Sequence, residues 1–467
     1  MFDFTRGSFS RQFNSARRRW CQSHDLPFSD VLTPERLQAA LAEENVRYRQ
    51  GAFTPLITLW TFLAQVFSPD HSCRDAVARL IAFLAAHGQR TCSAGTASYC
   101  RARQRLPERL LARLVQSSGD QLHRQVVSES LTIAGRRVYV ADGTTVSMPD
   151  TPANQKAYPQ ARTQRPGVGF PIARLLALFS LTSGAVLDMA IDKYRGKGTG
   201  EQSLLRGLLG RLQGDSVLLG DRIFCTYWNL ALLINLDVHG VFRLHQGRRH
   251  DARGVRRLGT NDWIRVWSRP QRPVWMNQAD YDALPDELVV RHVRVEVRQP
   301  GFRARRLVVA TTLLDPAETS AAEIAGLFRA RWQAELKLRS LKTVLQMDVL
   351  RCKTPAMVRK EIWLHLLAYN LVRETMAQAA QQTGAEPYEI SFKGALQTMN
   401  RFHDLLVSTR QERLPELLSL LLIAIGTHRV ANRPGRYEPR AVKRRPKPHR
   451  LLLMPRHEAR RCLLDGR

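Results

Sequence analysis

The sequence predicts an α/β protein, a mixed sheet with helices, flanked by helical regions on both sides. Short β-rich runs alternate with amphipathic helices over 131–380, while the chain before and after this stretch shows helical patterns. From 246 to 306 the chain becomes basic and strand-like, which indicates a β-rich insertion. The expected divisions are a helical N-terminal region, 1–130, an α/β domain in two parts, 131–245 and 307–380, around the insertion, 246–306, and a helical C-terminal region with a basic tail, 381–467.

The composition favours a partner that is a nucleic acid. Lys and Arg number 71 against 41 Asp and Glu, a net charge of +30 spread over the whole length. Such a field attracts polyanions, whereas a membrane-surface protein more often confines its charge to one amphipathic segment. Seven cysteines without a C-x-x-C pair argue against a zinc ribbon and a disulfide framework. Because no apolar run is long enough to span a bilayer, we expect a cytoplasmic protein without a membrane partner.

The N-terminal region, 1–130, carries the start and stop signals of several helices, such as threonine–proline pairs and Gly88. A short segment within it contains Arg101, Arg103 and Arg105. These side chains are candidates for phosphate or groove contacts of a helix-turn-helix kind. The alternative is a basic surface helix.

Extended structure begins with the β-rich run 137–141, which ends at Asp142-Gly143 before a second run, 144–148. Asp-Gly between two such runs is a hairpin signal, and a turn aspartate would face solvent. Alternatively, Asp142 is an inward-facing acid at the end of a strand. The sequence leaves both interpretations open.

The next segments read as a hairpin, 171–181 with 185–191, followed by a glycine-rich loop and a helix over 201–212. The loop lacks the G-x-x-x-x-G-K-[ST] order of a phosphate loop. A buried-strand pattern at 216–220 then ends on Asp221. This acid either caps the following helix or, as an acid at the C-terminal end of a strand, lies where ligands and metals usually bind.

One helix is expected over 320–346, and it presents two neighbouring stripes. The apolar stripe consists of Leu327, Ala334, Leu338, Leu341 and Leu345. A second set falls within roughly 60° at about 100° per residue, namely Phe328, Arg331, Glu335 and Lys342. Glu335 therefore shares a face with Arg331, Arg339 and Lys342. This face is either a solvated ladder of i,i+4 ion pairs or part of a site.

Asp142, Asp221 and Glu335 can converge at one edge of the sheet. Three such carboxylates suit phosphoryl transfer with two divalent cations, roughly 3.5–4 Å apart, and hard oxygen ligands select Mg²⁺ or Mn²⁺. Without cations the crowded carboxylates would repel one another. The basic residues around Glu335 can then hold DNA phosphates, with Arg331 able to grip one bidentately.

The spacing Phe328-x2-Arg331-x3-Glu335-x6-Lys342 resembles the Y-x2-R-x3-E-x6-K signature of the insertion-sequence-4 family of bacterial DDE transposases. The segments ADGTTVSMPD and GDRIF resemble the first and second aspartate motifs of that family. Similar flanking stretches, SYCRARQRLP, RCKTPAMVRKEIWLHLLAYNLVRE and YEPRAVKRRPKPHR, extend the resemblance over most of 93–450.

The resemblance implies an RNase H-like catalytic domain interrupted by a β-rich insertion. It also implies a homodimer in a synaptic complex that binds terminal inverted repeats and target DNA, at the bacterial nucleoid. Asp142 would bridge both metals, while Asp221 and Glu335 would each hold one. Arg331 and Lys342 would contact phosphate near the cleaved end. Phe328 replaces the signature tyrosine, so only stacking or packing is expected of it.

The resemblance further implies that a tryptophan of the insertion stacks on a flipped base. Trp263, Trp267 and Trp275 are candidates, and each can instead belong to a β core. We expect a transposase that cuts the ends of its element and joins the freed 3′-hydroxyls to target DNA. The alternatives are a metal nuclease of the same fold that does not join, and a non-catalytic DNA-binding relic or repressor.

Overall fold

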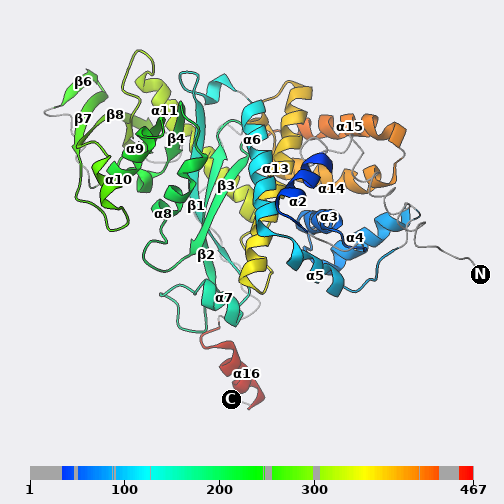
Figure 1. Cartoon of the computed structure of the whole chain (residues 1–467). Coiled ribbons are helices and arrows are strands. Elements are labelled where there is room, and N and C mark those ends of the chain that lie inside the picture. Colours follow the sequence, from blue (N-terminus) through cyan, green and yellow to red (C-terminus); the bar gives the residue numbers. More distant parts are fainter. Residues whose placement is uncertain are drawn as a thin grey trace, which may run out of the picture.

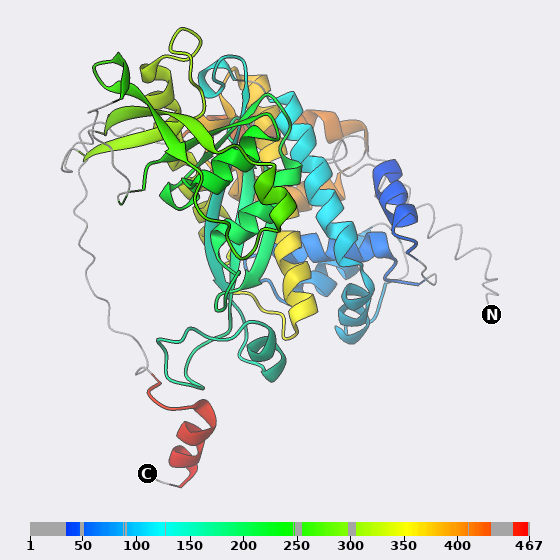
Figure 2. The same ribbon diagram turned by 60° about the vertical axis from the view of Figure 1, so that its left-hand side comes forward.

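The computed structural model describes residues 34–46, 51–86, 88, 91–126, 128–245, 247, 255–297, 305–409, 411–430 and 452–465. Thr33 of the first threonine–proline pair and most of the expected basic tail, up to residue 451, lie outside these ranges, whereas Pro34 begins a helix as predicted. Figures 1 and 2 show a central sheet with helices packed along it. Within the described chain, no helix is long and apolar enough to cross a membrane.

A mixed sheet forms the centre of the described structure, with nine strands in the order β3-β2-β1-β4-β5-β9-β8-β7-β6. The strands are β1 (Arg137–Ser147), β2 (Ile172–Ser180), β3 (Val186–Lys193), β4 (Ser216–Gly220), β5 (Val238–Arg243), β6 (Arg256–Gly259), β7 (Asp262–Ser268), β8 (Glu287–Val297) and β9 (Arg305–Thr311). The first three strands are antiparallel neighbours, and β4 and β5 run parallel to β1. From β5 outward the pairing is again antiparallel, so β6, β7 and β8 extend the central sheet. The predicted α/β class is confirmed.

β1 runs without a turn through Asp142-Gly143, so the hairpin interpretation of this dipeptide is wrong. The predicted hairpin of β2 and β3 is present, and β2 pairs with β1 from Tyr139 to Ser147. This long antiparallel partner holds β1 extended where the local Asp-Gly signal would have turned it. On its other side β1 pairs with β4 only as far as Val140. Its edge is then unpaired in the described structure until Ser147 bridges to Val349.

Successive β1 side chains point to opposite faces and enter two cores. Val138, Val140 and Val146 join a core with α6 (Glu108–Gln125) and α13 (Pro355–Thr383), which lie side by side in Figure 1. Tyr139 and Ala141 join a second core with α8 (Glu201–Leu208) and α9 (Tyr227–Ile234). The helix predicted over 201–212 ends at Leu208, and a 3-10 turn over Leu209–Arg211 continues it.

Helices from both ends of the chain pack near α13. The N-terminal set is α2 (Pro34–Glu43), α3 (Pro55–Phe67), α4 (Cys73–Ala86) and α5 (Ala97–Arg105), and the later set is α14 (Phe392–Ser408) and α15 (Leu414–Thr427). As predicted, Thr54 caps α3 by accepting from the Ile57 amide, and Gly88 has a positive φ of 63° just after α4. Three further helices are α7 (Pro152–Ala157), α10 (Gln278–Asp282) and α16 (Arg456–Leu464).

Candidate active site

The two predicted aspartates lie level with each other at the unpaired edge of β1. Val140 pairs in parallel register with Leu219, and Asp142 and Asp221 each follow two residues after this last pair, which places them at the same level of the sheet. Asp142 is therefore in mid-strand and not at a strand end, a correction to the sequence-based expectation. Asp221 directly follows β4, as expected. Because β4 stops there, no strand separates the two side chains.

Glu335 reaches this edge from a helix packed against β1. The helix predicted over 320–346 is divided into α11 (Ala321–Ala330) and α12 (Trp332–Arg339), followed by a π-helical turn over Ser340–Val344. Lys337 explains how α12 is held. Its buried ammonium donates to the Ser180 and Leu181 carbonyls, at 3.1 and 3.0 Å, where β2 ends. This pins α12 to the sheet two residues after Glu335.

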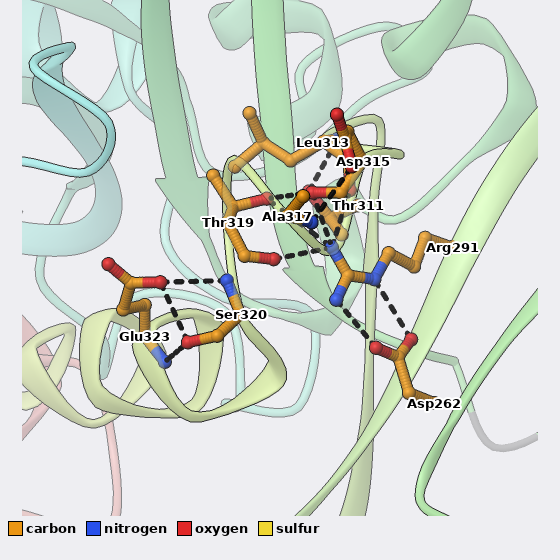
Figure 3. A network of polar contacts seen from close by, with 9 residues as sticks. All are labelled: Asp262, Arg291, Thr311, Leu313, Asp315, Ala317, Thr319, Ser320 and Glu323. Carbon is orange, nitrogen blue, oxygen red and sulfur yellow. Dashed lines mark hydrogen bonds and ion pairs between the residues drawn. The ribbon is translucent and has the colours of Figure 1, made fainter. Parts of the chain in front are cut away.

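A buried arginine anchors the start of α11 (Figure 3). Arg291, on β8, is fully buried and ion-pairs with Asp262 at 2.5 Å. The Arg291 guanidinium also donates to the Thr319 carbonyl at 2.7 Å. The next residue, Ser320, caps α11 in a reciprocal capping box with Glu323. Arg291 thus holds the loop before α11, and Lys337 holds α12, which carries Glu335, against the sheet.

The acids influence one another electrostatically around Asp142. The pKa of Asp142 is raised to about 6, chiefly by burial and also by the negative charges of Glu335 and Glu201. The Arg331 guanidinium and a hydrogen bond from the Gly143 amide act in the opposite direction. Arg331 also donates to Glu335, with 3.1 Å between Nη2 and Oε1. Arg331 therefore neutralises charge that the carboxylates share.

Carboxylate oxygens are the hard donors that Mg²⁺ and Mn²⁺ prefer, and crowding of like charge around Asp142 favours a bound cation. Among the described residues, no three His, Cys, Asp or Glu side chains stand close enough, as they lie, to hold a metal ion. The Glu335 carboxylate is instead ion-paired with Arg331. The carboxylate donors fit such a cation in their chemistry.

The other predicted residues of this helix face lie at different depths. Phe328 is buried in the core, and its ring centroid lies 5.8 Å from the Arg331 guanidinium carbon. Its environment is that of a packing residue. Arg339 is exposed and Lys342 partly buried. The apolar stripe is buried as predicted at its described leucines, Leu327, Leu338, Leu341 and Leu345.

The three arginines of α5 do not share one environment. Arg101 and Arg105 are exposed, as a DNA contact requires. Arg103 is buried, donates to Gln65 Oε1 at 3.2 Å and lies over the Tyr99 ring. The sequence-based assignment of Arg103 to DNA is therefore corrected, because its guanidinium is engaged inside the protein. At helical spacing, residues 101 and 105 share a face that residue 103 does not.

The tryptophans also separate by exposure. Trp263 and Trp267 belong to the second core, as the β-core interpretation expected. Trp275 is 45% exposed. Its ring lies under the Arg206 guanidinium of α8, 3.9 Å from the centroid, and meets the Trp228 ring edge-on at 6.3 Å.

Sequence reasoning missed Glu201, whose charge affects Asp142 and is in turn affected by Asp221. An acid at the first position of a helix is an ordinary feature, so it carried no signal by itself. Only the fold brings it beside Gly143.

Comparison with known proteins shows the family of this chain. A family model described as the transposase DDE domain matches residues 133–371, just over half of the chain. The transposase InsG of insertion sequence element IS4 from Escherichia coli K12 is 27% identical over 429 residues, 89% of this chain and 91% of that protein. The transposase of element IS421 from Escherichia coli is 40% identical over 76 residues, 16% of this chain and 20% of that protein.

Among solved structures, the piggyBac transposase in a synaptic complex with hairpin DNA is similar with a TM-score of 0.41 at 12% identity. The match covers 88% of this chain and 86% of that one. With the family model matched across the strands and helices that carry Asp142, Asp221 and Glu335, the chain belongs to the transposases with a DDE domain, enzymes of phosphoryl transfer on DNA.

Proposed function

We propose that this transposase acts on an insertion sequence of the IS4 type, binding its terminal inverted repeats, cleaving the DNA there and joining the freed 3′-hydroxyls to target DNA. The proposal is supported by the parallel pairing of β1 with β4 just before Asp142 and Asp221, by the packing of α12 against β1, and by the effect of the Glu335 charge on the pKa of Asp142. Two Mg²⁺ or Mn²⁺ ions held there would activate the attacking oxygen and stabilise the leaving one. An RNase H-like catalytic domain is supported by three antiparallel strands followed by two that run parallel to β1.

DNA would approach along the basic side chains near the acids. Arg331 and Lys342 lie four and seven residues from Glu335 in the sequence and would hold a phosphate beside it. Arg339, four residues after Glu335, is exposed. Arg331 would exchange its ion pair with Glu335 for phosphate when a cation arrives. The exposed Arg101 and Arg105 would add contacts distant from the chemistry. Trp275, the exposed tryptophan of the three candidates, would stack on a flipped base.

The proposed assembly is a homodimer that pairs two element ends. Similarity to a bacterial transposase over 91% of its length supports placing the protein in the bacterial cytoplasm, on the nucleoid. The net charge of +30 supports non-specific attraction to DNA in addition to any sequence-specific contact.

The test is cleavage of labelled element ends with Mn²⁺, comparing the wild type with Asp142→Ala, Asp221→Ala and Glu335→Ala. Each substitution should abolish cutting and joining while leaving DNA binding. Glu287→Ala, which removes an exposed acid from the start of β8, is the matched control and should retain activity. Cutting without strand-transfer products would reduce the proposal to a nuclease. Tight binding without cutting by the wild type would leave a DNA-binding relic.

A further inference from the structure

Glu201 is placed against β1 more closely than an ordinary helix-start residue. A β-carbon built on Gly143 would lie 2.4 Å from Cδ of Glu201 and 2.6 and 2.8 Å from its two carboxylate oxygens. Such distances are shorter than any contact a real β-carbon makes, so the carboxylate occupies the space that a side chain at this position would fill. Gly143 directly follows Asp142, which places Glu201 beside the proposed catalytic centre.

Two hydrogen bonds keep Glu201 in this place. Arg174 on β2 donates to the Thr199 carbonyl at 3.0 Å and so holds the loop before α8. Gln202 donates through Nε2 to the Ile223 carbonyl at 2.9 Å, in the 3-10 turn that follows Asp221. Glu201 is therefore tied on one side to the sheet and on the other to the segment that carries Asp221.

The carboxylate of Glu201 is partly buried without a direct partner. Within the described part of the chain, it forms no ion pair and accepts no hydrogen bond. Arg174 acts on it electrostatically, while Asp221 opposes its charge. Its oxygens are therefore available, beside solvent, to a ligand that comes from outside the chain.

The topology lets acids from both faces of the sheet meet. Asp142 and Gly143 are successive residues of a strand, so Asp142 faces the side of α12 and Gly143 faces the side of α8. Glu335 approaches on the first side and Glu201 on the second. Because β1 pairs with β4 only as far as Val140, no described strand covers the edge between the two faces at this level. A cation bound at this edge would lie between the acids of the two faces.

We propose that Glu201 is a fourth carboxylate of the active site, which ligates the divalent cation from the face opposite Glu335. This inference rests on the proposed function and deepens it, since it enlarges the ligand set. Gly143 is then required because any side chain there would displace Glu201. The competing account is that Glu201 only favours the start of α8 through the helix dipole.

The first experiment measures Mn²⁺ binding to the full chain without DNA, by electron paramagnetic resonance of free Mn²⁺. Glu201→Gln should weaken Mn²⁺ binding at least tenfold, and Asp142→Asn should weaken it as well. The exposed control Glu287→Gln should leave Mn²⁺ binding unchanged. In EDTA, Glu201→Gln should melt at the same temperature as the wild type or higher, because a charge among like charges is removed. The Mn²⁺-induced rise in Tm should shrink. A residue that only supports the helix would not produce this opposite pair of changes.

The second experiment uses Gly143. Gly143→Ala should weaken Mn²⁺ binding in the wild type but add no further loss in the Glu201→Ala background, where the space is free. Wild-type Mn²⁺ affinity in Glu201→Gln, together with a loss in Asp142→Asn, would overturn the fourth ligand and leave the proposed function intact. If the wild type bound Mn²⁺ no better than Asp142→Asn and did not cut DNA, both proposals would fall.

Discussion

Replacing Asp142 by asparagine should stabilise the metal-free protein, although it removes a catalytic acid. The fold raises the pKa of Asp142 from 3.8 to about 6, chiefly through burial. Each pKa unit corresponds to about 1.4 kcal/mol, so the ionised carboxylate disfavours folding by up to about 3 kcal/mol. Partial exposure of Asp142 makes this an upper bound. Asparagine keeps the shape and can still accept from the Gly143 amide.

The pH dependence has a definite sign. A raised pKa means that the folded state binds the proton more tightly, so the penalty is absent below about pH 3.8, grows as the pH rises, and is complete above about pH 6. At pH 5 about half of it remains by the same linkage relation. The advantage of Asp142→Asn should therefore be full at pH 8 and smaller at pH 5.

Thermal unfolding in EDTA at these two pH values measures the effect. Asp282→Asn, a substitution of an exposed aspartate in α10, should leave Tm unchanged and serves as the control. Adding Mn²⁺ at pH 8 should stabilise the wild type and not Asp142→Asn. A wild type more stable than the variant at pH 8 without metal, or an advantage independent of pH, would refute a desolvated carboxylate at this position.

Further substitutions test other parts of the molecule. Lys337→Met should lower the free energy of unfolding by about 1–3 kcal/mol in denaturant titrations, because two buried carbonyls lose their donor; unchanged stability would contradict the anchoring of α12. Arg103→Ala should be destabilising by about 2–4 kcal/mol, whereas Arg101→Ala and Arg105→Ala should leave stability unchanged and each reduce the salt dependence of DNA binding by about one counterion. Trp275→Ala should keep Tm but slow any step that needs a flipped base by roughly 10- to 100-fold, and a large drop in Tm would instead indicate a core residue.

The sequence was informative wherever a pattern extended over many residues. The apolar hairpin of β2 and β3 and the helical flanks could be predicted because burial repeats with a regular period. The order of three acids between such elements was also readable. These features depend on patterns that repeat over many residues, so one residue that does not fit the pattern does not change the prediction.

Local signals misled where tertiary contacts decide the outcome. Asp142-Gly143 carries a turn signal, yet pairing with β2 keeps it extended. The helix pattern of 320–346 gave no sign of the break at Arg331, which divides it into α11 and α12. Arg103 and Glu201 each lie in charged or polar surroundings in the sequence, and only packing distinguishes the buried arginine and the acid beside β1 from solvated ones.

Arg291 has a consequence for anyone who would exchange parts between related transposases. A graft of 246–306 alone would bring in Asp262 and Arg291 but leave behind Leu313, Asp315 and Thr319, whose carbonyls this arginine satisfies. If the two parents differ at these positions, the chimera would leave either a buried guanidinium or several buried carbonyls without partners just before α11. The transplantable unit therefore ends after Thr319, and chimeras cut there should fold where those cut at 306 fail.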